Sequence, residues 1–139
     1  IIASDAMLAV KRILRLPLRL RFLGNRRLIK RLPLMFGNSI CCPATSYKKE
    51  AAGGRLVDSP FRFALDWDNL DRLACEEGRF ICEERPLLYY RVHGGAATKA
   101  CMEDNRREEE ERAMFSRYWP EWMVRLLMAG YREAYKEYD

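Results

Sequence analysis

The sequence lacks any apolar run near the roughly 18–20 residues that a helix needs to cross a bilayer. Residues 1–34 do not read as a signal peptide, because Lys and Arg interrupt every apolar stretch. The five cysteines are odd in number and form no C-x-x-C pair, so neither a disulfide framework nor a structural zinc site is predicted. A reducing, cytoplasmic setting is favoured. We expect the cysteines to be buried as small apolar side chains: Cys41, Cys42, Cys75, Cys82 and Cys101.

Motifs of several enzyme classes are missing too. No G-x-x-x-x-G-K-[ST] or G-x-G-x-x-G loop is present, so nucleotide binding by those routes is not expected. His93 is the only histidine, and no Ser-His-acid or Cys-His signature surrounds it. A lone histidine at a strand end is more often a hydrogen-bonded structural residue than a ligand, and both interpretations stay open for His93.

What the sequence does contain is enough apolar material for one folded domain. Its 139 residues are 49% hydrophobic and 32% charged, which excludes a disordered tail or a low-complexity linker. The net charge of +5 is unevenly placed. Nine Lys and Arg against one Asp give residues 1–34 a net charge of +8, and the remaining residues sum to −3.

Residues 1–34 are predicted to form a basic amphipathic helical segment. The first helix spans residues 6–16 and ends at Pro17, and a second, shorter helix runs from an N-cap at Asn25 to Pro33. The apolar face of the first helix consists of Met7, Val10 and Leu14.

Two interpretations of this basic segment stay open. Its apolar face packs inside the protein while its basic face is solvated, or residues 6–31 contact a membrane surface or another anionic ligand. Nucleic acid is not expected as a partner. Phe22 is the only aromatic residue before Phe36, and bases need aromatic side chains to stack on.

Residues 35–97 are expected to combine short strands with one helix. Two strands, 79–83 and 87–93, are predicted to form a β-hairpin. A helix is predicted from an N-cap at Asp66 to a stop at Gly78.

Residues 98–139 are predicted to form a helical tail. A charged helix over 98–118 presents the run 106–112 to solvent, and Pro120 separates it from a last helix. The last helix carries an apolar stripe that can pack on the chain's own core or on a second subunit of a homo-oligomer: Met123, Leu127, Tyr131, Tyr135 and Tyr138.

Asp66-Trp67-Asp68 is the other candidate for chemistry. An Asp-x-Asp pair can hold a divalent cation, because carboxylate oxygens are good ligands for hard ions. Equally, Asp66 can cap the helix while Asp68 lies in its first turn, where the helix dipole favours anions. The residues alone leave both interpretations open.

A series of short motifs follows in a fixed order between residues 34 and 98. They are F-G-N-S-I-C-C-P, S-Y-K-K-E, G-G, L-D-W-D-N-L-D-R-L-A, G-R-F-I and P-L-L-Y-Y-R-V-H-G-G. This ordered series resembles the second half of family 2 glycosyltransferases, which have the A-type nucleotide-sugar transferase fold. The resemblance implies an α/β fold (α+β in this portion): the C-terminal half of a sandwich, with a few short strands, a β-hairpin and helix-rich ends.

The resemblance also implies roles for individual residues. Asp66 matches the catalytic base of inverting members, although Leu65 stands where Glu is common. Trp67 and Asp68 belong to the same motif and are implied to contact donor or acceptor. Gly53 and Gly54 match a glycine turn beside the sugars.

Three residues of the predicted second strand complete the implied site. His93 matches a histidine that in some relatives helps to hold the metal or the donor diphosphate. Arg91 lies on the same strand face and can reach phosphate oxygens, and Tyr89 is a further residue for lining the cleft. The implied cofactor is Mg²⁺ or Mn²⁺, with most of its ligands in the family's first half.

The main departure from the family is that its first half is missing. No initial strand with a uridine-binding Asp and no metal-binding Asp-x-Asp precede these motifs. We therefore expect a C-terminal portion, with residues 35–97 as its acceptor half, that is inactive by itself. The implied reaction moves a sugar from a nucleotide-diphosphate donor to a saccharide or lipid-linked acceptor, in the cytoplasm or at the inner face of the membrane. The alternative is a non-catalytic remnant or a basic membrane- or polyanion-binding module.

Overall fold

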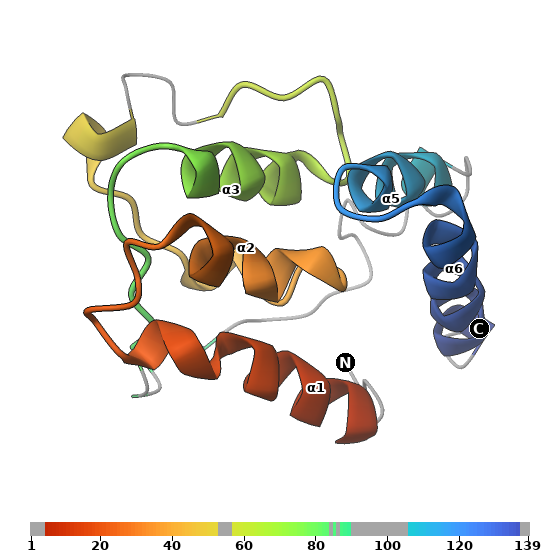
Figure 1. Cartoon of the computed structure of the whole chain (residues 1–139), viewed down its shortest axis with the longest axis horizontal. Coiled ribbons are helices and arrows are strands. Elements are labelled where there is room, and N and C mark those ends of the chain that lie inside the picture. Colours follow the sequence, from red (N-terminus) through yellow and green to blue (C-terminus); the bar gives the residue numbers. More distant parts are fainter. Residues whose placement is uncertain (1–4, 53–56, 84, 86, 90–105, 137–139) are drawn as a thin grey trace.

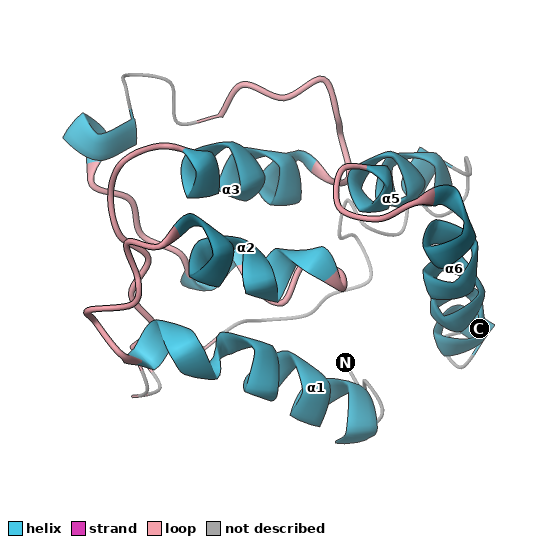
Figure 2. Ribbon diagram, viewed as in Figure 1, coloured by secondary structure: helices cyan, strands magenta, loops and turns pink. Residues whose placement is uncertain are grey.

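The computed structural model describes residues 5–52, 57–83, 85, 87–89 and 106–136. Within these residues the fold consists of five α-helices and three short 3₁₀-helices (Figure 2). They are α1 (Asp5–Arg15), η1 (Leu16–Arg19), α2 (Arg27–Met35), η2 (Cys42–Ala44), η3 (Lys49–Ala52), α3 (Leu65–Cys75), α5 (Arg106–Ser116) and α6 (Glu121–Lys136).

The expected α/β sandwich with a β-hairpin is wrong, because the described residues contain no β-strand. The predicted first strand, 79–83, runs beside the connection between α1 and α2. There the Phe80 N–H donates to the Gly24 carbonyl at 2.9 Å, and the Cys82 N–H donates to the Leu18 carbonyl at 3.2 Å. The segment that accepts these two hydrogen bonds is a 3₁₀-helix followed by a turn. It is not a strand, so no regular ladder can extend from the two bonds.

The predicted second strand, 87–93, is also wrong for the residues that the structure describes. Residues 87–89 are irregular, with the Leu87 and Tyr89 side chains exposed, and residues 90–93 lie outside the described part of the chain. Short apolar runs between turn residues predict strands only when a neighbouring strand supplies hydrogen bonds. Among the described residues, the two runs have no neighbouring strand, and Ile81, Leu87 and Leu88 are exposed.

Three helices form a stack, which is closed at one end by the last two (Figure 1). In this view α2 lies between α1 and α3, and α5 and α6 pack together beside the stack. The core lies where α3, α5, α6 and the end of α2 meet. Its buried residues are Leu34, Ala64, Trp67, Leu70, Ala74, Met114, Phe115, Val124 and Met128.

The helices of the basic segment are confirmed, with shifted ends. α1 stops at Arg15, and Pro17 lies in the following 3₁₀-helix. α2 begins after Arg26, whose side chain makes no capping hydrogen bond, so the predicted Asn25 cap is wrong. Pro33 lies inside α2, which continues to Met35, so the predicted end of the helix at Pro33 is wrong.

A buried lysine side chain from the neighbouring helix contacts the C-terminal end of α3. Lys30 of α2 is 1% exposed, and its Nζ donates to the carbonyl of Glu76 at 2.6 Å and that of Gly78 at 3.4 Å. Burial lowers the pKa of this ammonium group. Lys30 thus satisfies carbonyls that every helix C-terminus leaves without partners, and its charge suits the negative end of the helix dipole.

We expect Lys30→Met to lower the free energy of unfolding by about 2 kcal/mol, because the carbonyls of Glu76 and Gly78 lose their charged donor. Urea denaturation measures this change. Arg27→Met, at an exposed position one turn earlier on α2, is the matched control and should leave stability unchanged. A more stable Lys30→Met protein would mean that burying the charge costs more than its hydrogen bonds return.

The charged run of α5 is not the solvated face that we expected. Glu110 is 8% exposed and Glu111 4%. The Glu110 carboxylate accepts backbone N–H groups of Arg62, Phe63 and Ala64, at 2.7 to 3.2 Å. An acidic side chain from α5 therefore fixes the chain just before α3 begins.

The last helix is confirmed, but its buried face differs from the predicted stripe. Val124 and Met128 reach the core, and Leu127 and Tyr131 pack against it. The Tyr131 hydroxyl donates to the carbonyl of Phe36 at 3.1 Å, so α6 also covers the end of α2. Nothing is described of the Tyr135 side chain or of Tyr138.

The expectation of buried cysteines is wrong for the described ones. Cys41, Cys42 and Cys75 are exposed and Cys82 is partly exposed, all as free thiols, while Cys101 lies outside the described residues.

No helix in the described ranges is long and apolar enough to span a bilayer.

Candidate functional site

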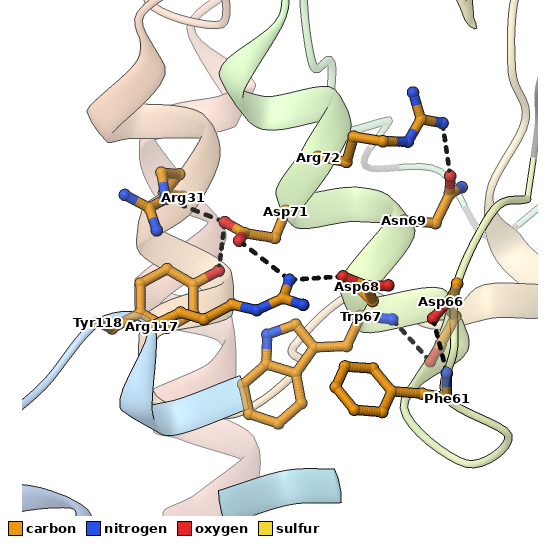
Figure 3. Close-up of polar contacts among 11 residues, drawn as sticks. Arg31, Phe61, Asp66, Trp67, Asp68, Asn69, Asp71, Arg72, Arg117 and Tyr118 are labelled. Carbon is orange, nitrogen blue, oxygen red and sulfur yellow. Dashed lines mark hydrogen bonds and ion pairs between the residues drawn. The ribbon is translucent and has the colours of Figure 1, made fainter. Parts of the chain in front are cut away.

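The polar residues of α3 lie on two faces of the helix (Figure 3). Asp68 and Asp71 are three residues apart and share one face, while Asp66 and Asn69, also three apart, share another. Trp67 points between them into the core. The helical spacing thus separates the aspartates that the sequence places together.

Asp68 and Asp71 form a buried ion-pair network. Asp71 accepts hydrogen bonds from the Arg31 Nε at 3.0 Å and from the Tyr118 hydroxyl at 2.7 Å. The Arg117 Nη1 donates to Asp68 and lies 3.6 Å from the Asp71 Oδ2. Both carboxylates are 7% exposed. The network joins α2, α3 and the segment after α5, so Asp68 is placed as a structural residue, away from any open surface.

Trp67 is likewise part of the core. Its side chain is 3% exposed, and its ring meets the Phe115 ring edge-on at 5.1 Å between centroids. Such aromatic pairs contribute mainly through packing. The implied contact of Trp67 with donor or acceptor does not fit a side chain that is buried in the core.

Asp66 faces away from the network. It lies in the first turn of α3, whose N-cap is Ala64, so the predicted capping role is wrong. Its Oδ2 accepts the side-chain amide of Asn38 at 3.0 Å, and its Oδ1 accepts the Trp67 N–H at 2.8 Å. Burial raises the pKa of the Asp66 carboxyl above its ordinary 3.8, and these hydrogen bonds oppose the rise.

Three further polar side chains surround Asp66. Although Cys42 is exposed, partial desolvation raises the pKa of its thiol, and the Asp66 charge raises it further. Burial also raises the pKa of the Tyr47 hydroxyl, while a hydrogen bond with Asn69 opposes the rise and the charges of Cys42 and Asp66 add to it. We call these five residues the Asp66 cluster: Asn38, Cys42, Tyr47, Asp66 and Asn69.

An open groove of about 670 Å³ begins beside this cluster. Tyr47 belongs to both, and Asp66 itself is set back from the groove lining. Apolar side chains from three segments line the groove, among them Ile40, Leu73 and Phe80. Tyr89, a predicted lining residue, is fully exposed and does not contribute.

The described residues do not fit the implied Mg²⁺ or Mn²⁺. No three His, Cys, Asp or Glu side chains among them converge on one point. Asp66 is the one carboxylate of the Asp66 cluster, and the amides, thiol and phenol hydroxyl of its other members are a poor set of ligands for a hard cation. Gly53, Gly54, Arg91 and His93 lie outside the described residues, so their roles stay predictions.

Sequence reasoning missed most of the cluster. Asn38, Cys42 and Tyr47 lie within the first two quoted motifs, but nothing in them marks which side chains turn toward α3. Asn69 could have been found, because it lies three residues after Asp66 and therefore shares its helical face.

Comparison of the chain with models of known families, with curated proteins and with solved structures finds no match in any of the three.

Proposed function

We propose that the Asp66 cluster is the general-base site of a glycosyltransferase that acts on a hydroxyl acceptor. The observation that carries this proposal is the contrast within α3. Asp68 and Asp71 are paired with arginines, whereas Asp66 has no ion pair with a described residue and is partly exposed, in a cluster whose Tyr47 lines the groove. The ordered motifs quoted above add the reaction class.

The reaction assigned to Asp66 is a proton transfer coupled to substitution. A free lone pair of the carboxylate takes the proton of the acceptor hydroxyl as its oxygen attacks the anomeric carbon. The bond from this carbon to the nucleoside diphosphate breaks at the same time, and the diphosphate leaves with the electron pair, so the configuration inverts. Asn38 and the Trp67 N–H hold the carboxylate in place.

The raised pKa of Asp66 supports this role and gives the sign of the pH dependence. A carboxylate with a raised pKa is a stronger base, and burial raises the pKa of Asp66 in this way. Transfer should fall as the pH drops through the pKa of Asp66, at a value above the ordinary 3.8 of aspartate.

The test is Asp66→Asn in the protein that carries this chain, assayed with a panel of uridine, guanosine and thymidine diphosphate sugars and monosaccharide or prenyl-lipid acceptors. We expect transfer, followed as released nucleoside diphosphate, to fall by roughly 10²–10⁴-fold, the size of a general-base contribution. Donor binding and thermal unfolding should stay unchanged.

Glu109→Gln, which removes an exposed carboxylate of α5, is the control and should keep full activity. Unchanged transfer in Asp66→Asn would remove the assigned base. Absence of transfer from every donor by the unmodified protein would favour a non-catalytic role.

A further inference from the structure

α1 lies on the protein with much of its apolar face turned outward. Val10 is 51% exposed, and Ile13, one turn further, is 61% exposed. Lys11 points the other way: burial lowers its pKa, and its charged neighbours include Glu111 and Arg107 of α5. Of the two interpretations left open for this segment, the one in which its apolar face packs inside the protein does not hold for Val10.

The exposed apolar surface continues past the end of α1. Leu16, Leu20 and Phe22 follow along η1 and the turn, and Leu28 lies at the start of α2, all between 42% and 70% exposed. In Figure 1 α1 is the outermost helix of the stack, with α2 on its inner side. Large apolar side chains exposed at several positions of one segment are typical of an interaction surface.

Basic side chains accompany these apolar ones. Arg12, Arg21, Arg26 and Arg27 are all exposed. The sequence has no acidic residue between Asp5 and Glu50. The surface is thus both apolar and positively charged, and the carboxylate that shares a pocket with Arg12 is Glu83, from a distant segment.

We propose that this α1–α2 face, made of the six apolar side chains and four arginines just named, docks onto a membrane surface that contains anionic phospholipid. The apolar side chains enter the boundary between headgroups and acyl chains, and the guanidinium groups bind headgroup phosphates. In Figure 1 α2 lies between α1 and α3, whose first turn carries Asp66. The inference does not depend on the proposed transferase activity.

Two other occupants fit less well. Two copies of the chain meeting through this face would bring like charges together, which opposes association. A nucleic acid would satisfy the arginines but not the aliphatic side chains, and Phe22 is the only aromatic residue of the face.

The experiment is flotation with vesicles of phosphatidylcholine alone and with vesicles that also contain phosphatidylglycerol. We expect binding to the anionic vesicles only, and weaker binding at high salt, because salt screens the arginines. Each Arg→Gln change at Arg12 or Arg26 should weaken binding by roughly five-fold, the effect of one basic residue near an anionic surface.

Substitution of apolar residues separates this docking from simple charge attraction. The double variant Ile13→Ser, Phe22→Ser should lose most vesicle binding at any salt concentration. The matched control, Trp122→Ser with Leu126→Ser, changes two residues of α6 that are each 66% exposed and should bind as the unmodified protein does. All four positions are exposed, so circular dichroism should show every variant folded.

Three outcomes would overturn the proposal. The first is no binding to anionic vesicles, and the second is equal loss of binding in the α6 control. The third is that the unmodified protein forms a dimer, detected by light scattering, and binds no vesicles, while the Ile13→Ser, Phe22→Ser variant is a monomer. Tight binding to single-stranded DNA that is insensitive to the apolar substitutions, without vesicle binding, would indicate a polyanion site instead.

Discussion

Glu110→Ala is expected to lower the free energy of unfolding by about 3 kcal/mol, because three buried or partly buried backbone N–H groups lose a charged acceptor. These groups, of Arg62, Phe63 and Ala64, lie just before α3, and Glu110 is the side chain that the structure shows binding them. The chain that leads into α3 would then lose its attachment to α5. Chemical denaturation with urea measures the change.

Two variants show whether the hydrogen bonds are the cause. Glu110→Gln keeps one acceptor oxygen and should lose roughly half as much stability, since hydrogen bonds to neutral groups are weaker than those to charged ones. Glu109→Ala alters the exposed neighbouring residue and should change stability little. If Glu110→Ala and Glu109→Ala have the same small effect, the carboxylate does not hold the segment before α3.

Gly37→Ala is expected to cost about 3 kcal/mol of stability, from backbone strain and a steric clash together. Gly37 has a φ of +96°, which disfavours any side chain. A Cβ at this position would also overlap the Tyr131 hydroxyl, which donates to the carbonyl of Phe36. Thermal unfolding measures the loss, and the same substitution should break the contact between α6 and the end of α2.

Gly130→Ala is the control within α6. A Cβ at Gly130 meets nothing within 4 Å, and the residue lies inside a helix. The substitution should therefore raise stability, by about 0.5–1 kcal/mol, as the gain in helix propensity from Gly to Ala predicts. If Gly37→Ala and Gly130→Ala act in the same direction, the tight contact of Gly37 with Tyr131 is absent in solution.

The helices could be predicted from the sequence because their signals are local. Apolar spacing, Pro17 and Pro120 place α1 and α6 within a few residues of their observed ends. The strands could not, because whether residues 79–83 find a neighbouring strand depends on the rest of the fold. The exposed face of α1 is a similar case. The sequence shows that this helix is amphipathic, and only the packing shows which of its faces is exposed.

The candidate site divides in the same way. The D-W-D motif directed attention to Asp66, which the structure also places apart from the ion pairs. Nothing in the motif distinguishes Asp66 from Asp68, however, because that difference comes from Arg117, 49 residues later in the chain. Likewise, a run of glutamates on a charged helix gives no local sign that Glu110 is buried.

The sequence by itself determined the positions of the helices, the positive charge of the first segment and the absence of a long apolar span. Within the described residues, tertiary structure alone decided that the short apolar runs form no sheet, that Asp68 has an ion pair and Asp66 none, and that α1 turns apolar side chains outward. The physical reason is the range of the interactions. Helix propensity and net charge act within a few neighbouring residues, whereas strand pairing, burial and ion pairing depend on partners brought together from distant parts of the chain.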